Sequence, residues 1–298
     1  MSTLVIETSD GIRSIAINKP AKRNSLSADT LQELSTALED ADKDPDVRVI
    51  LIHGLPTIFS AGSDLEEIVA GNKISAGVDN ARHLISVADN VRKPLIAAVN
   101  GPAVGLAVTL LMACDLVYCG KHALFSLPFT ALGETPLFGI TQRLIAECGY
   151  HHAAEKLLLS EPITAEQAVA LHIANGVFED EDVLREATAR AVRLTRMPPE
   201  ALIRTKSLLR GILHSDTREQ SKKEAEAFNE QLQEPEIVEA HRAFLEGRRP
   251  DFSKSLVKNE GSAPEQGSRF QTVFNKLDSV LTSGKGIINK IKSENKGL

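Results

Sequence analysis

The amino-acid sequence predicts an α/β core followed by a helical C-terminal part. Two short apolar runs, residues 47–52 and 95–99, have the composition of strands that are buried on both faces. Amphipathic helical patterns alternate with these runs, and after Gly133 nearly every pattern is helical. Strands that alternate with helices indicate a sheet covered by helices, and a later run of helices indicates a helical layer added to that core.

The first half of the chain contains the predicted sheet. Asp10-Gly11 separates two β-rich runs and therefore predicts a hairpin. A helix is expected after Ser27, its candidate N-cap, because apolar residues then recur every three or four positions. Four further elements are expected: helices over 78–91 and 105–114, and strands over 115–119 and 123–127.

The second half is expected to be helical. Thr164 and Gln167 have the spacing of a capping box, and Gly176 suits the end of the helix that they begin. Further helices are expected over 182–196, 200–213 and 216–232. We therefore divide the chain into a core, residues 1–198, a helical region, residues 199–252, and a C-terminal tail, residues 253–298.

The tail joins a polar linker to an amphipathic helix. It has eight Lys or Arg against four Asp or Glu, and apolar residues return with helical spacing from Phe270. Such a helix either docks on the acidic body of the protein or a sister subunit, or lies on a membrane surface. We expect docking, because the basic face is modest.

Composition excludes several classes of protein. The chain has 298 residues, 42% hydrophobic residues and a net charge of -6, which indicates a globular protein without nucleic acid as a partner. No apolar run reaches the ~18 residues of an integral membrane span. The first residues are not typical of a signal peptide, and three cysteines make no disulfide framework. No metal-ligand spacing is present, so we expect a cytoplasmic protein without a metal.

Two turns of small residues follow the predicted strands. Phe59-Ser-Ala-Gly-Ser-Asp-Leu65 comes after the first apolar run, and Asn100-Gly-Pro-Ala-Val-Gly-Leu106 leads from the second into a helix. Small residues let a ligand approach the backbone closely, and a helix start has unpaired N–H groups. Two such turns facing each other could hold a carbonyl oxygen between two amide donors, which is an oxyanion hole.

These motifs resemble the enoyl-CoA hydratase/isomerase (crotonase) family. The resemblance rests on residues 18–26, on the two turns, and on Cys114-Asp115, and it covers about residues 3–252. The amino-acid sequences of residues 100–105 and 128–133 are most similar to those of the enoyl-CoA isomerase subgroup. The resemblance implies a crotonase-like spiral of ββα turns and a helical region that makes homotrimers or pairs of trimers. It implies an acyl-CoA substrate, with coenzyme A as part of the substrate and no other cofactor.

The resemblance also implies roles for individual residues. The backbone amides of Ala61 and Leu106 would bind the thioester oxygen, although Leu106 stands where the family usually has glycine. The positions of the family's acid/base carboxylates fall on Thr109, Phe129 and Leu137, which cannot carry a proton. The residues expected to line the substrate site are Lys22, Arg23, Ala61, Gly62, Ser63, Asp64, Leu106, Thr109, Phe129 and Leu137.

Glu134 is the candidate that replaces the missing carboxylates, because its turn should border the acyl pocket. A solvent-facing turn glutamate is the alternative. We expect an enzyme that shifts or hydrates a double bond through an enolate held by the amide pair. Two other functions stay open. One is a CoA-thioester hydrolase that uses His83, whose sequence position is close to that of the catalytic histidine in a dehalogenase of the family. The other is a non-catalytic acyl-CoA-binding or assembly protein.

Overall fold

The computed structural model describes residues 2–65, 74–231 and 234–252. The larger of its two sheets has six strands in the order β1-β2-β3-β4-β6-β9. In that order, the strands are Leu4–Ser9, Ile12–Ile17, Val49–His53, Leu95–Val99, Leu116–Gly120 and Gly176–Phe178. β1 and β2 are antiparallel, and the other neighbours are parallel. The predicted hairpin is confirmed, since Asp10 and Gly11 both have positive φ angles between paired Ser9 and Ile12.

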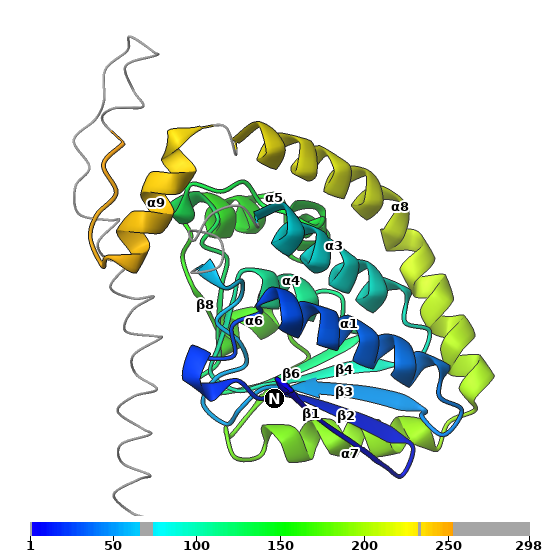
Figure 1. Cartoon of the computed structure of the whole chain (residues 1–298). Helices are drawn as coiled ribbons and strands as arrows, with labels where there is room; N and C mark the ends of the chain where they lie inside the picture. Colours follow the sequence, from blue (N-terminus) through cyan, green and yellow to red (C-terminus); the bar gives the residue numbers. More distant parts are fainter. Residues whose placement is uncertain (1, 66–73, 232–233, 253–298) are drawn as a thin grey trace, which may run out of the picture.

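Helices cover both faces of this sheet (Figure 1). α1 (Ala28–Lys43) and α3 (Ile74–Asn90) lie on one face, and α7 (Val183–Thr195) packs on the other. Successive side chains of a strand point to opposite faces. Accordingly, Ile50 and Ile52 join the core under α1 and α3, whereas Val49 and Leu51 join a second core under α7. The predicted burial of these strands on both faces is thereby confirmed.

A smaller sheet links the two small-residue turns. It has the order β5-β7-β8, with bounds Pro102–Val104, Leu124–Ser126 and Ile163–Thr164. β5 lies inside the segment that the sequence indicated to be a turn, because three residues are too few for a periodic signal. Ser60 forms a bridge with Ala103 of β5. The turn after β3 and the segment after β4 are therefore held side by side.

The remaining helices begin with α4 (Leu106–Leu111), which is buried as predicted. They continue with α5 (Ile140–Leu158), α6 (Ala165–Ala170), α8 (Pro199–Gln231) and α9 (Pro235–Leu245), beside the short 3-10 helices η1 (Pro20–Lys22) and η2 (Thr130–Leu132). The capping box is confirmed, as the Thr164 hydroxyl accepts a hydrogen bond from the Gln167 amide. Gly176 begins β9 instead of ending α6, which corrects that prediction.

α8 is one helix where the sequence predicted two. The residues between the predicted helices, 214 and 215, include neither glycine nor proline, so nothing ends the helix there. α8 runs along the outside of the molecule (Figure 1). α9 then packs against η2. Asp115 fastens α8 to the core, since its carboxylate lies 2.6 Å from Lys206 Nζ and 2.9 Å from Arg210 Nη2.

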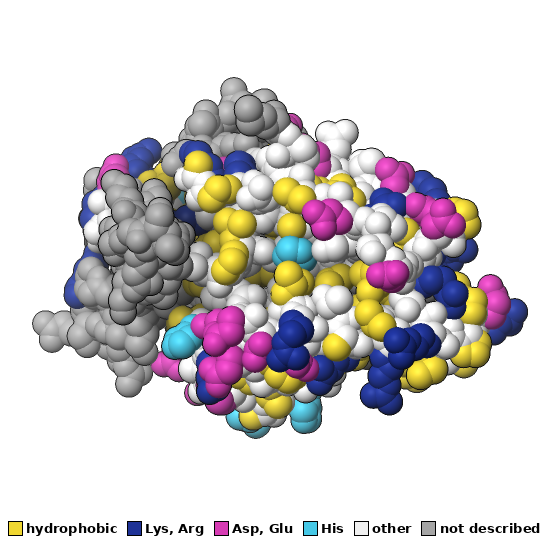
Figure 2. All heavy atoms as spheres, turned by 90° about the horizontal axis from the view of Figure 1, so that it is seen from below, with side chains coloured by type: hydrophobic (Ala, Val, Ile, Leu, Met, Phe, Trp, Pro, Cys, Tyr) yellow, Lys and Arg dark blue, Asp and Glu magenta, His cyan; other side chains and the backbone are white. Residues whose placement is uncertain are grey.

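The surface mixes charges of both signs. On the face below the sheet, Figure 2 shows Lys and Arg alternating with Asp and Glu around scattered hydrophobic side chains. In the part of the chain that the structure describes, no helix combines the length and apolar character needed to cross a bilayer. The predicted tail, residues 253–298, lies outside the described residues, and the division at residue 198 stays a prediction.

Candidate active site

Two pockets meet beside the small-residue turns. The first lies between the turns and the C-terminal end of α9, and the second extends toward α1, α3 and α8. The residues that line both pockets are Ser63, Asp64, Leu106, Phe129 and Glu134. These residues therefore stand where the pockets join.

The turn after β3 has a conformation that only glycine allows at its centre. Gly62 has a φ angle of +80°, and a Cβ there would lie 2.3 Å from the Val104 carbonyl oxygen. The Ser60 hydroxyl supports the turn, since it donates to the Asn24 carbonyl at 2.7 Å and accepts from the Gly62 amide at 3.0 Å. Gly62 lines neither pocket and shapes the turn through its backbone, and its expected ligand contact stays a prediction.

The structure corrects the choice of Ala61 as an amide donor. The Ala61 N–H donates to the Arg23 carbonyl at 3.0 Å and is already engaged. Two residues later, the Ser63 N–H has no hydrogen-bond partner among the described residues. Sequence spacing could not separate these two amides, because the choice depends on how the turn pairs with residues 23–26.

Leu106 presents the second unengaged amide. It is the first residue of α4, so its N–H has no partner within that helix, and the described residues outside the helix supply none. The preceding residue, Gly105, has a φ angle of +53°. Leu106 and Ser63 both line the junction of the pockets.

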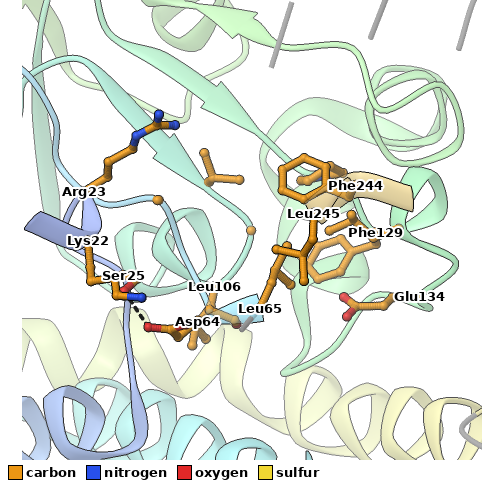
Figure 3. A pocket seen from close by; sticks show the side chains of 16 residues that line it. Lys22, Arg23, Ser25, Asp64, Leu65, Leu106, Phe129, Glu134, Phe244 and Leu245 are labelled. Carbon is orange, nitrogen blue, oxygen red and sulfur yellow. Dashed lines mark hydrogen bonds between the residues drawn. The ribbon is translucent and has the colours of Figure 1, made fainter. Parts of the chain in front are cut away.

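Glu134 faces the pockets and is paired with a histidine. Its Oε1 lies 2.7 Å from His241 Nε2, and the exposed fractions of the two side chains are 14% and 3%. Figure 3 shows the Glu134 carboxylate pointing into the pocket, toward the side that carries Leu65 and Leu106. The alternative of a solvent-facing glutamate is therefore wrong. An ionised carboxylate only accepts hydrogen bonds, so His241 Nε2 is the donor when Glu134 is ionised.

Sequence reasoning missed His241. It lies on α9, more than one hundred residues after Glu134, and the packing of α9 against η2 brings the two together. The sequence pattern that points to its burial is its spacing: His241 lies four residues after Ile237 and three before Phe244, on the apolar face of α9. A histidine on such a face has no distinguishing mark until its partner is known.

The expected carboxylate positions are apolar or remote. Phe129 lines both pockets and Leu137 lines the second, whereas Thr109 is buried within α4 and lines neither. His83 also lies outside both pockets. Its side chain is 60% exposed on α3, 3.8 Å from Glu39, so the geometry does not support the hydrolase that would use it.

The mouth of the first pocket has positive charge. Lys22 and Arg23 line it opposite Phe129, Glu134 and Phe244 (Figure 3). The Asp64 carboxylate accepts from the Ser25 hydroxyl at 2.9 Å, which fixes the turn to the segment after η1. Lys22 and Arg23 thus share one pocket with Ala61, Ser63 and Asp64 of the turn.

Comparison with known proteins decides the family. A sequence profile described as "Enoyl-CoA hydratase/isomerase" matches residues 7–255. The chain belongs to the enoyl-CoA hydratase/isomerase family. The family resemblance drawn from the motifs is confirmed.

Relatives in this family have names of two kinds. The chain is 34% identical to the 2,3-dehydroadipyl-CoA hydratase of Escherichia coli K12, over 85% of this chain and 99% of that protein. It is also 34% identical to the human enoyl-CoA delta isomerase 2, over 70% of this chain and 54% of that protein. The hydratase and the isomerase thus have the same percentage identity to this chain, over matched lengths of 252 and 214 residues.

Solved structures of enoyl-CoA hydratase/isomerase proteins confirm the crotonase fold. The chain matches one from Pseudoalteromonas atlantica with a TM-score of 0.78 and 29% identity, over 84% of this chain and 100% of that chain. It matches a putative one from Acinetobacter baumannii with a TM-score of 0.72 and 35% identity, over 79% of this chain and 99% of that chain.

Proposed function

We propose that this protein moves the double bond of an enoyl-CoA thioester through an enolate held by the amides of Ser63 and Leu106. One observation carries the proposal: the two residues whose amides are unengaged, Ser63 and Leu106, line the pocket junction that Glu134 also lines. Preformed amide donors stabilise negative charge as it develops on a carbonyl oxygen. A carboxylate beside them can remove a proton from the neighbouring carbon.

The pockets suit the two parts of an acyl-CoA. The first pocket has Lys22 and Arg23 at its mouth, where the phosphates of coenzyme A would be attracted. The second is mostly apolar and suits the acyl chain. The thioester carbonyl then lies at the junction, within the reach of Ser63 and Leu106. No cofactor beyond the CoA of the substrate is required.

In this reaction a single carboxyl group can both remove and return the proton. Glu134 removes a proton from C2 of a 3-enoyl-CoA, and the electron pair moves onto the thioester oxygen to give a dienolate. The same carboxyl group then returns a proton to C4, and the double bond lies between C2 and C3. Hydration would need one group to activate water and another to protonate C2. Two described carboxylates line the junction. Asp64 holds the turn through its hydrogen bond with Ser25 and its ion pair with Lys19, whereas the Glu134 carboxylate points into the pocket, so we assign the proton to Glu134 (Figure 3).

His241 is proposed as a positioning residue. It does not need to contact the substrate, because its hydrogen bond to Glu134 Oε1 leaves Oε2 to receive the proton. Its burial fixes the orientation of the carboxylate, which otherwise would turn freely about its terminal torsion angle. The C-terminal helical region thereby contributes to the site of its own chain.

The test uses trans-3-hexenoyl-CoA in heavy water, followed by NMR. The expected product is the 2-enoyl-CoA, and Glu134→Gln should lower its rate by about 100-fold or more. Gln keeps a hydrogen bond with His241 but cannot carry the proton, so it is a shape-matched control. Formation of 3-hydroxyhexanoyl-CoA as the first product would show hydration instead. Undiminished turnover by Glu134→Gln would exclude Glu134, and binding without turnover would favour the non-catalytic alternative.

We also infer that the protein forms homotrimers. Leu208, Leu209 and Ile212 on α8 expose large apolar side chains, and Leu208 and Ile212 are 76% and 77% exposed. Contiguous apolar surface of this kind is typical of a subunit contact. Light scattering should give a mass that is a multiple of three 32.2 kDa chains; a monomeric mass at micromolar concentration would exclude the trimer.

A further inference from the structure

We infer that the second pocket accepts an uncharged hydrocarbon chain and rejects an acyl group that ends in a carboxylate. This inference rests on the proposed function, because it assigns the second pocket to the acyl part of the substrate. The pockets share Ser63, Leu106 and Glu134, so an acyl chain that leaves this junction away from Lys22 and Arg23 enters the second pocket.

The far walls of the second pocket are apolar and buried. Leu31 of α1, Phe138, Phe228 of α8 and Ile237 of α9 have exposed fractions of 8% or less. They come from four separate segments that pack around one space. A hydrocarbon chain placed there is removed from water, which stabilises its binding by about 0.8 kcal/mol for each CH₂ group.

The two pockets differ in charge. Lys22 and Arg23 line the first, whereas the described residues that line the second include no Lys or Arg. The charged side chains of its described lining are the carboxylates of Asp64 and Glu134. Its titratable nitrogen base, His241, already contacts Glu134 at 2.7 Å. A terminal carboxylate in this space would meet apolar walls and two groups of its own charge.

This arrangement distinguishes substrates of equal length. Hexanoyl-CoA and adipoyl-CoA both have six-carbon acyl groups and differ in the methyl or carboxylate at the far end. A carboxylate removed from water without a partner is strongly disfavoured, whereas the methyl group is favoured. The pocket should therefore bind the first and exclude the second. The dehydroadipyl-type substrate in the name of the bacterial relative would not suit this chain.

Calorimetric titration of the full-length protein with free coenzyme A, hexanoyl-CoA and adipoyl-CoA tests the inference. Hexanoyl-CoA should bind about 100-fold tighter than free coenzyme A, from the burial of its chain. Adipoyl-CoA should bind no tighter than free coenzyme A. If the two acyl-CoAs bind with equal affinity and both bind tighter than free coenzyme A, the inference is overturned while the proposed acyl site stands. If hexanoyl-CoA binds no tighter than free coenzyme A, the proposed acyl site is overturned and the inference with it.

A variant with an added cation provides a second test. Val78 lines the second pocket from α3 and is half-buried, so a longer side chain can be accommodated there. Val78→Arg should reduce the preference for hexanoyl-CoA over adipoyl-CoA by about 10-fold, because it gives the carboxylate a partner. Val78→Met is the uncharged control and should leave that preference unchanged. An unchanged ratio in the arginine variant, with circular dichroism like that of the control, would contradict the placement of the chain end.

Discussion

The two walls of the pocket junction differ in the groups that the proposed reaction would use. On one wall, the turn around Gly62 and the start of α4 present backbone amides, those of Ser63 and Leu106. On the other wall, the loop after η2 and α9 present side chains, those of Glu134 and His241. A backbone donor survives a change of side chain, so Leu106 can stand where the family usually has glycine. A side-chain acid does not survive such a change, and the family resemblance implies this loss at Phe129 and Leu137.

If the Leu106 residue acts through its backbone amide, removal of the amide hydrogen should lower activity strongly. Leu106→Pro removes the amide hydrogen, and proline is tolerated at the first residue of a helix. Removal of one oxyanion-hole donor typically lowers kcat by about 100-fold to 1000-fold. We expect a loss of that size in the isomerisation assay with trans-3-hexenoyl-CoA.

Leu106→Ala is the matched control for this variant. It also removes the leucine side chain but keeps the N–H, so most of the activity should remain. Equal losses in the two variants would attribute the effect to the side chain and contradict the difference between the walls.

The side-chain wall should respond to a change in His241. His241→Leu removes the hydrogen bond to Glu134 and should lower kcat by about 10-fold to 100-fold, since a misplaced catalytic group loses that much. His241→Gln can still donate a hydrogen bond and should recover part of the loss. The loss should fall on kcat, with KM changed by no more than about twofold, because His241 acts through Glu134 and not on the substrate. A lower Tm with an unchanged kcat would indicate a purely structural role.

The smallest effect is expected at Ser63. Ser63→Ala removes a hydroxyl but keeps the amide that is proposed to bind the thioester oxygen, so kcat/KM should change by no more than about twofold. A loss as large as that of Leu106→Pro would mean that the hydroxyl acts on the substrate. This wall would then act through a side chain as well as through its backbone amides.

Much of the fold could be predicted from local patterns. The hairpin at Asp10-Gly11, the doubly buried strands and the capping box at Thr164 depend on neighbouring residues, and all three are confirmed. β5 is too short to give a pattern, and the continuity of α8 depends on what the sequence lacks at 214 and 215.

The site was predicted less completely, for reasons that are also physical. The place of Glu134 at the pocket follows from its position next to a family motif, and its role stays a prediction. His241 depends on a contact between α9 and η2 that no local spacing encodes. The amide of Ala61 was chosen instead of that of Ser63, because only the three-dimensional pairing with Arg23 shows which one is engaged.

The proposed binding of the thioester oxygen by two amides predicts that the bound C=O group is polarised. Infrared difference spectra of hexanoyl-CoA labelled with ¹³C at the thioester carbonyl report the strength of hydrogen bonds to that oxygen. On binding to the wild-type protein, the C=O stretch should move to lower frequency, and Leu106→Pro should reverse most of this shift while Leu106→Ala retains it. A bound thioester whose C=O frequency equals that in an apolar solvent would contradict the claim that the two amides hold its oxygen.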